Sequence, residues 1–500
     1  MNWAAAVSIG LDPRVRELEC TGGPRPAPRV TVTRVYRAGR SRERVASRPG
    51  AVGGGAPTRW IDAGGPKTVA MTTLGITGGR VLRPGMTVER ADVLVDREAG
   101  EIVDVGSEVG ADADERLDAS EAVVLPGLVN AHTHVAMTLL RGYADDKPLD
   151  AWLREDVWPA EAAMGPEDVR SGARLGALEM IRSGTTGFVD MYFEVPEVAA
   201  AVDESGLRAR LGHGVVTVGK EENEAREDAA ESVAIAEELD GAAGGRVRTA
   251  FMPHSLTTVS DEILAEFLPE AREAGVPVHF HANETRAEVE PFAERGERPL
   301  THARERGLLD PADFLAHGVH LDGEEIDHLA ETGAGVVHCP ASNMKLASGT
   351  APVQRLLDAG IAVGLGTDGA ASNNDLDMLG EVRDAALLGK LGADDASAVA
   401  APDAVRMATA GSAAVAGLPG GRVAPGAAAD LAVVSLDRAH LTPVHDPVSH
   451  LAYAARGGDV RHTVCDGRVL MRDREVLTLD ADAVRATAQE RAAALVDRAA

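Results

Sequence analysis

A chain of 500 residues is longer than one compact domain usually needs, and its hydrophobic fraction of 45% suffices for a full core. The net charge of −28 makes nucleic acids and anionic membranes unfavourable partners, since both carry the same sign of charge. The sequence has no run of 18 apolar residues and no recognisable secretory signal, and its three cysteines are widely spaced. We therefore expect a cytoplasmic protein without a disulfide framework.

The excess of 78 acidic over 50 basic residues has two explanations. Like charges at this density repel one another, and concentrated salt screens that repulsion, which predicts a halophilic cytoplasm. The alternative is an ordinary acidic protein from a GC-rich, arginine-rich genome. Activity that is undiminished in dilute buffer would exclude the halophilic explanation.

Residues 1–70 differ in composition from the rest of the chain. They carry a net charge of +7, which leaves −35 on residues 71–500, and they are rich in Pro, Gly and Arg without sustained periodicity. We expect a disordered extension or a misassigned start, with Met71 as the physiological first residue. A functional basic arm is the alternative, and N-terminal sequencing of the native protein would decide.

Both ends of the remaining chain show short β-type runs separated by turns. These runs are 74–77, 91–95, 102–105, 122–125, 430–435 and 460–471. They predict a small flanking β-sandwich domain that is built from residues 71–127 and 418–480. An Ala-rich stretch follows and predicts a C-terminal helix over 481–500.

Residues 128–417 repeat a strand, a polar exit and an amphipathic helix. The helix predicted over 166–182 begins with Pro166, has two acids in its first turn and ends before Gly184. The predicted strands are 128–134, 185–192, 208–216, 247–254, 276–283, 313–319, 334–339 and 361–367. Parallel strands that alternate with helices in this number predict an α/β fold, a (β/α)8 TIM-type barrel with its active site at the C-terminal strand ends.

Two histidines end the first of these strands. Side chains alternate faces along a strand, so His132 and His134 point to one side while Thr133 points away. Two imidazoles on one face can bind one metal ion, although two polar residues at a strand exit are the simpler explanation. Other strands therefore have to supply the remaining ligands.

Polar side chains at other strand ends can complete such a site. His281 ends the fifth strand, and Glu284 follows it where a carboxylate can reach a metal-bound water. His317 ends the sixth strand, and Asp368 follows the eighth, before a Gly/Ser turn. Because the strands of a barrel end at one rim, we expect these side chains to meet.

Three neutral imidazoles, one carboxylate and an open position are typical of a catalytic zinc site, whereas structural zinc sites favour thiolates. Ferrous iron suits the same ligands, so we expect one divalent ion per subunit, Zn²⁺ first and Fe²⁺ as the alternative. Such an ion lowers the pKa of its water from about 15.7 to roughly 7 and so supplies hydroxide at neutral pH.

The chain resembles the amidohydrolase superfamily in 130–134, His281, Glu284, His317 and 366–374. Within the superfamily, its segments 137–142, 190–193, 340–346 and 351–355 are similar to the 5-methylthioadenosine/S-adenosylhomocysteine deaminases. The similarity extends over residues 73–480. It implies metal-dependent deamination of the adenine ring of 5'-substituted adenosines, with inosine analogues and ammonia as products.

The resemblance also implies roles for individual residues. The implied metal ligands are His132, His134, His281 and Asp368, around a single ion, and the fourth strand has no lysine for a bridging carbamate. Glu284 would transfer the proton at the purine ring, His317 would orient or polarise the attacking water, and Asp368 would take the hydroxide's proton.

The implied substrate contacts lie partly outside the strand ends. Glu161 would bind the ribose hydroxyls, His254 would contact the nucleoside, and Trp152 would line the pocket, together with Glu284 and Asp368. A solvated carboxylate at a helix start is the simpler explanation for Glu161.

One position departs from the subgroup's pattern. The arginine that contacts the homocysteine carboxylate is replaced here by His213, and Arg226 is only an insecure match for a second arginine. The change puts S-adenosylhomocysteine in doubt and leaves adenosine, 5'-methylthioadenosine and 5'-deoxyadenosine as substrates.

Two other functions stay open. Another amidohydrolase activity, on guanine, cytosine or a triazine, is the enzymatic alternative, although Glu284 favours deamination because leaving ammonia needs a proton donor. A non-catalytic scaffold barrel is the second alternative. We further expect a homo-oligomer that acts on a small-molecule nucleoside.

Overall fold

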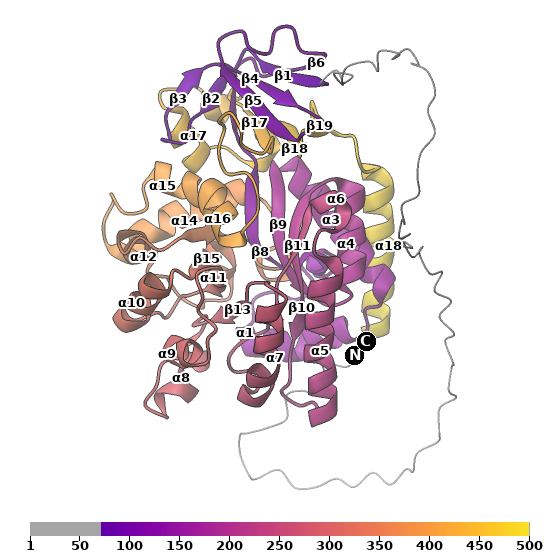
Figure 1. The fold of residues 1–500 in the computed structure, drawn as a ribbon, viewed down its shortest axis with the longest axis vertical. Helices are drawn as coiled ribbons and strands as arrows, with labels where there is room; N and C mark the ends of the chain where they lie inside the picture. Colours follow the sequence, from indigo (N-terminus) through magenta and orange to yellow (C-terminus); the bar gives the residue numbers. More distant parts are fainter. Residues whose placement is uncertain (1–71, 500) are drawn as a thin grey trace, which may run out of the picture. The chain divides into compact units, whose positions relative to one another are not determined.

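The computed structural model describes residues 72–499. The predicted N-terminal extension, residues 1–70, lies outside this range. Within it the chain has an α/β fold, in which sheets formed by the two ends of the described chain accompany parallel strands covered by helices (Figure 1). No helix in residues 72–499 combines the length and the apolar character needed to cross a membrane.

The two ends of the described chain form two sheets, with the strand orders β5-β4-β1-β6 and β20-β19-β18-β17-β7-β2-β3. Strand β7 pairs antiparallel with β17, from Ala122 opposite Ser435 to Pro126 opposite Leu431, so both ends contribute to one sheet. The strands are β1 (Thr73–Thr77), β2 (Arg80–Leu82), β3 (Val88–Arg90), β4 (Asp92–Asp96), β5 (Glu101–Gly106), β6 (Glu115–Asp118), β7 (Ala122–Pro126), β17 (Leu431–Ser435), β18 (Val460–Cys465), β19 (Arg468–Arg472) and β20 (Glu475–Val476).

Strand β17 separates two hydrophobic cores. Leu431 and Val433 pack with Ile76 of the four-stranded sheet, while Ala432 and Val434 face the core around the parallel strands. Successive side chains of a strand point to opposite faces, so one buried strand can serve both cores. The two terminal sheets thus enclose a core of their own, which supports the predicted β-sandwich in part.

The predicted β runs coincide with strands β1, β4, β5, β7 and β17 to within a residue or two. The run predicted over 460–471 is instead a hairpin of β18 and β19, because Asp466 and Gly467 both adopt left-handed backbone and turn the chain. The sequence prediction missed β2, β3, β6 and β20, which are only two to four residues long.

All eight predicted parallel strands are present. They are β8 (Leu128–Thr133), β9 (Thr185–Tyr192), β10 (Arg208–Val215), β11 (Val247–Thr249) with the short β12 (Met252–Pro253), β13 (His279–Ala282), β14 (Phe314–His317), β15 (Gly335–His338) and β16 (Val363–Leu365). The structure arranges them as two parallel sheets, β11-β10-β9-β8 and β13-β14-β15-β16, and not as one continuous ladder.

Backbone hydrogen bonds nevertheless connect the two parallel sheets at both ends. The amide of His279 donates to the carbonyl of Phe251 at 3.0 Å, and the amide of Asp368 donates to the carbonyl of His132 at 3.0 Å. The ladder is interrupted because the fourth strand breaks between β11 and β12 and because Pro277 has no amide hydrogen.

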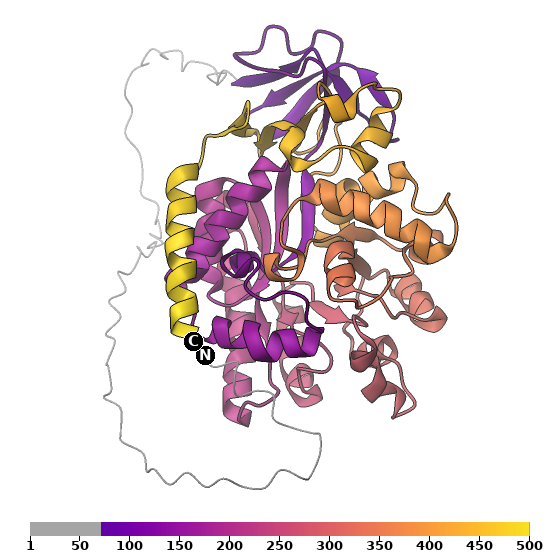
Figure 2. The ribbon, with the colours of Figure 1, turned by 180° about the vertical axis from the view of Figure 1, so that it is seen from behind.

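The helix predicted over 166–182 is confirmed as α3 (Pro166–Arg182). The Gly165 amide donates to the Asp168 carboxylate at 3.0 Å, and Gly184 with φ +87° follows the helix end. The helix predicted over 481–500 is α18 (Ala481–Ala499), which packs along α3 (Figure 2).

Helices connect successive parallel strands and cover their outer faces (Figure 1). They include α4 (Val195–Ser205), α5 (Glu222–Leu239), α7 (Asp261–Glu273), α8 (Arg286–Ala293), α9 (Pro299–Glu305), α10 (Gly323–Thr332), α11 (Pro340–Lys345), α12 (Val353–Asp358), α13 (Ala370–Asn373), α14 (Met378–Ala393), α15 (Ala401–Arg406) and α16 (Ser412–Ala416). Between β8 and α3 the chain makes an excursion through η2 (Val135–Leu140), α1 (Leu149–Trp152), η3 (Leu153–Val157) and α2 (Trp158–Ala162).

Candidate active site

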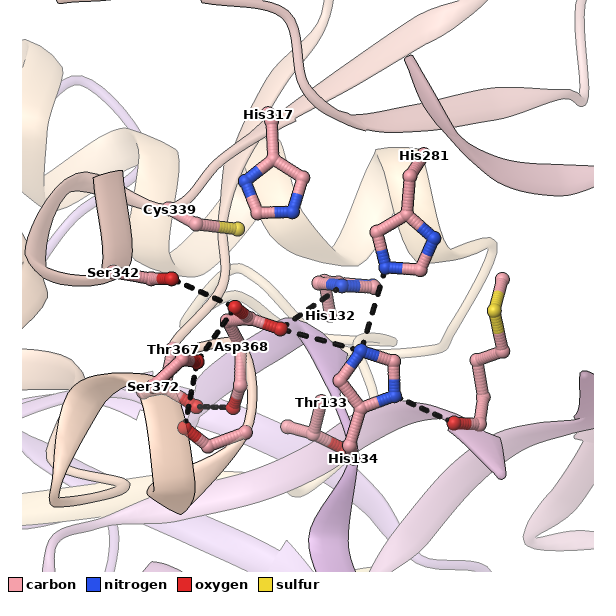
Figure 3. Close-up of polar contacts among 12 residues, drawn as sticks. His132, Thr133, His134, His281, His317, Cys339, Ser342, Thr367, Asp368 and Ser372 are labelled. Atoms are coloured by element: carbon pink, nitrogen blue, oxygen red, sulfur yellow. Dashed lines mark hydrogen bonds and ion pairs between the residues drawn. The ribbon is translucent and has the colours of Figure 1, made fainter. Parts of the chain in front are cut away.

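Side chains from both parallel sheets meet at the C-terminal strand ends (Figure 3). The Asp368 Oδ1 lies 3.2 Å from His134 Nε2 and 3.5 Å from His132 Nε2. The Nε2 atoms of His134 and His281 lie 3.4 Å apart. The structure therefore brings together all four residues that the resemblance implies as metal ligands, although they come from stretches far apart in the sequence.

The outer ring nitrogens of His134 and His281 show where their inner lone pairs point. The Nδ1 of His134 lies 2.7 Å from the carbonyl of Met191, and the Nδ1 of His281 lies 2.6 Å from the carbonyl of His254. A carbonyl oxygen can only accept, so each Nδ1 carries the proton and each Nε2 presents a lone pair. Two lone pairs that face each other at 3.4 Å cannot form a hydrogen bond. They require a cation between them.

Asp368 is held in a fixed orientation. Its Oδ2 accepts hydrogen bonds from the hydroxyls of Ser342 and Ser372, both at 2.7 Å, so its Oδ1 is left facing the histidines. Burial would raise the pKa of Asp368, but its contacts with His132 and His134 hold that pKa well below the ordinary value. The carboxylate is therefore ionised, as a metal ligand must be.

Burial shapes the protonation of the histidines as well. It lowers the pKa of His132 to about 4 and the pKa of His281 well below its ordinary value. Burial also opposes protonation of His134, but the hydrogen bond and charge of Asp368 outweigh it and raise that pKa to about 9. The site thus holds one positive charge as a proton on His134, in the place where a metal ion would supply charge.

The spacing of the donor atoms fits a small divalent cation. Donors at about 2.0–2.1 Å from a tetrahedral zinc ion lie roughly 3.3 Å from one another, close to the 3.2–3.5 Å between the atoms here. The Nε2 of His132 is buried without a hydrogen-bond partner in residues 72–499. One ligand atom each from His132, His281, His317 and Asp368 also lies within 4.8 Å of the others. These residues could hold one metal ion.

Glu284 and His317 stand beside this cluster. The Nε2 of His317 lies 3.8 Å from Glu284 Oε2, and its Nδ1 lies 2.9 Å from Asn343 Oδ1. Burial raises the pKa of Glu284. Burial disfavours the charged form of His317, but the negative charges of Glu284 and Asp368 raise its pKa nonetheless. A carboxyl group with a raised pKa is suited to donate a proton near neutral pH.

The predicted substrate contacts are at different distances from the cluster. The ring of His254 stacks near that of His281, with 4.6 Å between centroids, so it borders the site directly. Glu161 is buried beside Tyr192, and burial raises its pKa to about 7. The indole N–H of Trp152 donates to the carbonyl of Ala144, so its polar atom is directed towards the excursion between β8 and α3 rather than towards the histidines.

His213, which replaces the subgroup's arginine, lies in a buried polar cluster. Its Nε2 lies 2.9 Å from Asp228 Oδ1, and Lys220 Nζ lies 2.8 Å from Asp228 Oδ2. Arg226, the insecure second match, pairs with Glu222 and Glu266 at the surface. Both positive side chains near this strand are therefore already paired with carboxylates.

Sequence reasoning missed several residues that shape the site. Ser342 and Ser372 fix Asp368, and His279 lies 2.8 Å from the Nδ1 of His132. Asp190 accepts hydrogen bonds from the Thr133 hydroxyl and the following amide, and so fixes the turn after β8. The alternation of 278–281 carried a signal for His279, since it shares a strand face with His281.

The family model described as the amidohydrolase family matches residues 123–470, which is more than half of the chain. The chain therefore belongs to the amidohydrolase family, as the resemblance indicated. A relative from Natronomonas pharaonis, named 5-methylthioadenosine/S-adenosylhomocysteine deaminase, is 65% identical over 430 residues, covering 86% of this chain and 99% of that protein. A relative from Methanosarcina mazei, named 5'-deoxyadenosine deaminase, is 46% identical over 402 residues, covering 80% of this chain and 93% of that protein.

Among solved structures, the chain is similar to a crystal structure of an adenosine deaminase from Xanthomonas campestris with bound zinc. The TM-score is 0.79 and the identity 37%, and the match covers 85% of this chain and 98% of that one. The amidohydrolase-type fold and the enzyme class, hydrolysis of carbon–nitrogen bonds in cyclic amidines, are thereby established.

Proposed function

We propose that this chain hydrolyses the exocyclic amine of the adenine ring in 5'-substituted adenosines, releasing inosine analogues and ammonia. The observation that carries the proposal is the pair of opposed lone pairs on His134 and His281, next to the ionised Asp368 and the acid Glu284. The names of relatives that are 65% and 46% identical support the substrate class.

We also propose the finer architecture. The hydrogen bonds that connect the two parallel sheets support a (β/α)8 barrel over residues 128–417. The shared sheet of β7 and β17 supports a flanking β domain from residues 71–127 and 418–480, and α18 corresponds to the separate C-terminal helix.

The proposed cofactor is one divalent ion per subunit, Zn²⁺ or Fe²⁺, held by His132, His134, His281 and Asp368. When bound, it would lower the pKa of a water molecule enough to supply hydroxide near neutral pH. The bonds from His134 and His281 to backbone carbonyls keep both rings neutral and correctly turned for this role.

The remaining steps belong to side chains of this protein. Glu284, whose pKa is raised by burial, donates a proton to the ring nitrogen next to the carbon that bears the amine. Asp368 accepts the proton of the attacking nucleophile, and His317 orients that nucleophile from the opposite side. The protonated amine then leaves as ammonia.

Glu161, His254 and Trp152 are proposed to bind the nucleoside. Because His213 and Lys220 share the carboxylate of Asp228, neither is free to pair with a carboxylate on the substrate. We therefore propose a preference for uncharged 5'-substituents, as in 5'-methylthioadenosine, 5'-deoxyadenosine and adenosine, over S-adenosylhomocysteine.

The acidic composition, together with relatives from haloarchaea such as Natronomonas pharaonis, supports a halophilic enzyme. A cytoplasmic location and a homo-oligomeric state stay predictions.

Ammonia release from metal-loaded protein in high salt tests the function. The panel contains 5'-substituted adenosines, S-adenosylhomocysteine, guanine, cytosine and a triazine. Turnover should be fastest with the uncharged adenosines, should disappear on chelation and should return with Zn²⁺. Faster turnover of guanine, cytosine or the triazine would favour the other amidohydrolase activities, and protein that retains no metal would favour a scaffold.

A further inference from the structure

We infer that His279 is a positioning residue of the metal centre: as a neutral imidazole it accepts the Nδ1–H of His132 and so directs the Nε2 lone pair of His132 at the ion. The inference rests on the proposed function only in assuming that a divalent ion binds among these side chains.

His279 lies on β13, two residues before His281 and on the same strand face, so it lies one layer below the site. Its Nε2 lies 2.8 Å from His132 Nδ1, and its Nδ1 lies 3.1 Å from the carbonyl of Phe314. Its ring also stacks on the ring of Phe314, with 4.2 Å between centroids. Both imidazoles are fully buried, so no solvent competes for these contacts.

The positions of the protons follow from the carbonyl. Since the Phe314 oxygen can only accept, His279 Nδ1 must carry a hydrogen, which leaves Nε2 of the neutral ring as an acceptor. His132 Nδ1 then donates to it, and His132 Nε2 is left with its lone pair. That Nε2 atom has no hydrogen-bond partner in residues 72–499 and lies 3.5 Å from Asp368 Oδ1.

The opposite arrangement would need a doubly protonated His279. No carboxylate of residues 72–499 pairs with this ring, whose recorded partners are His132 and Phe314. A fully buried cation without a counter-ion is strongly disfavoured, so the neutral arrangement prevails.

His132 differs in this respect from the other two histidines of the site. His134 and His281 donate to backbone carbonyls, which no substitution removes, whereas the orientation of His132 depends on a side chain. A change at position 279 therefore acts on a ligand without touching any ligand. This makes the role of His279 separable from the roles of the ligands.

Two variants and a control test the inference. His279→Leu fills a similar volume but cannot accept, while the amide of His279→Gln can both accept from His132 and donate to the Phe314 carbonyl. His338→Gln is the control, because His338 is equally buried on β15 and neither of its ring nitrogens has a hydrogen-bond partner in residues 72–499.

The readout is Zn²⁺ affinity in competition with a chromophoric chelator, after circular dichroism shows that each variant is folded. We expect His279→Leu to lose about 10–100-fold in affinity, as other outer-shell substitutions do, and His279→Gln to retain most of it. His338→Gln should bind Zn²⁺ like the parent. Parental affinity in His279→Leu, or an equal loss in His338→Gln, would overturn the inference.

A second measurement needs no variant to fold with a changed core. In the Zn²⁺-loaded parent labelled with ¹⁵N-histidine, two-bond ¹H–¹⁵N correlations should show His279 protonated at Nδ1 alone. Protonation at Nε2, alone or together with Nδ1, would refute the relay. Both measurements are made without substrate, so a parent that binds Zn²⁺ but deaminates nothing would refute the proposed function and leave this inference intact.

Discussion

Replacing Glu284 by glutamine removes the proposed proton donor while keeping the shape of the side chain. Glu284 stands 3.8 Å from His317, and its remaining recorded side-chain contact is with Ser348 at 3.4 Å, so the four proposed metal ligands keep their own partners. A positioned general acid contributes about 10²–10⁴-fold to a rate, or about 2.7–5.5 kcal/mol of transition-state stabilisation. We therefore expect Glu284→Gln to lose that factor in kcat and to bind Zn²⁺ normally.

The assay follows ammonia release from 5'-methylthioadenosine, with metal content measured on the same samples. Glu288→Gln is the matched control, since Glu288 is the neighbouring buried acid and its carboxylate accepts from the Glu284 amide, which a glutamine oxygen can also do. We expect that control to stay within about tenfold of the parent. If Glu284→Gln kept more than a tenth of the parent's kcat, the acid would have to be another group; if it lost its metal, Glu284 would be a ligand.

Three further changes probe the framework of the site. Arg208→Met leaves the buried carboxylate of Asp430 unpaired and should cost about 3–5 kcal/mol of unfolding free energy in urea titrations; a loss below about 1 kcal/mol would contradict this. Glu161 has a pKa raised by burial from 4.5 to about 7, so its ionisation destabilises the folded state as the pH rises through that range. In metal-free protein Glu161→Gln should therefore gain about 3 kcal/mol over the parent between pH 4.5 and 7, and a pH-independent difference would count against the buried acid. In Gly366→Ala the added Cβ would lie 2.8 Å from His132 Cβ, so β8 and β16 must separate and metal content should fall; unchanged metal content would show that this contact can relax.

Several parts of the site could be predicted because their signals are local. His132, His134 and His281 each end an apolar strand, and a two-residue period fixes which side of the strand they face. Because parallel strands end at the same rim, the topology then brings separate strand ends together. These two rules suffice for the ligands, and the structure places them within about 3.5 Å of one another.

Other parts depend on contacts that no local pattern encodes. The serines that orient Asp368 come from the loops after β15 and β16, and the His279–His132 contact joins two sheets. The same is true of His213, whose pairing with Asp228 of α5 explains why a missing arginine does not leave a free cation. Such partners are chosen by packing in three dimensions.

The sequence alone determined the order of strands and helices, the strand ends that carry histidines, and the acidic surface, because each follows from periodicity or composition within a short window. Only the tertiary structure decided how the parallel strands divide into two connected sheets, how β7 finds β17, and which proton each imidazole carries. A ring nitrogen's role is set by the carbonyl or side chain opposite it. That partner lies on a different strand, and only folding brings the two together.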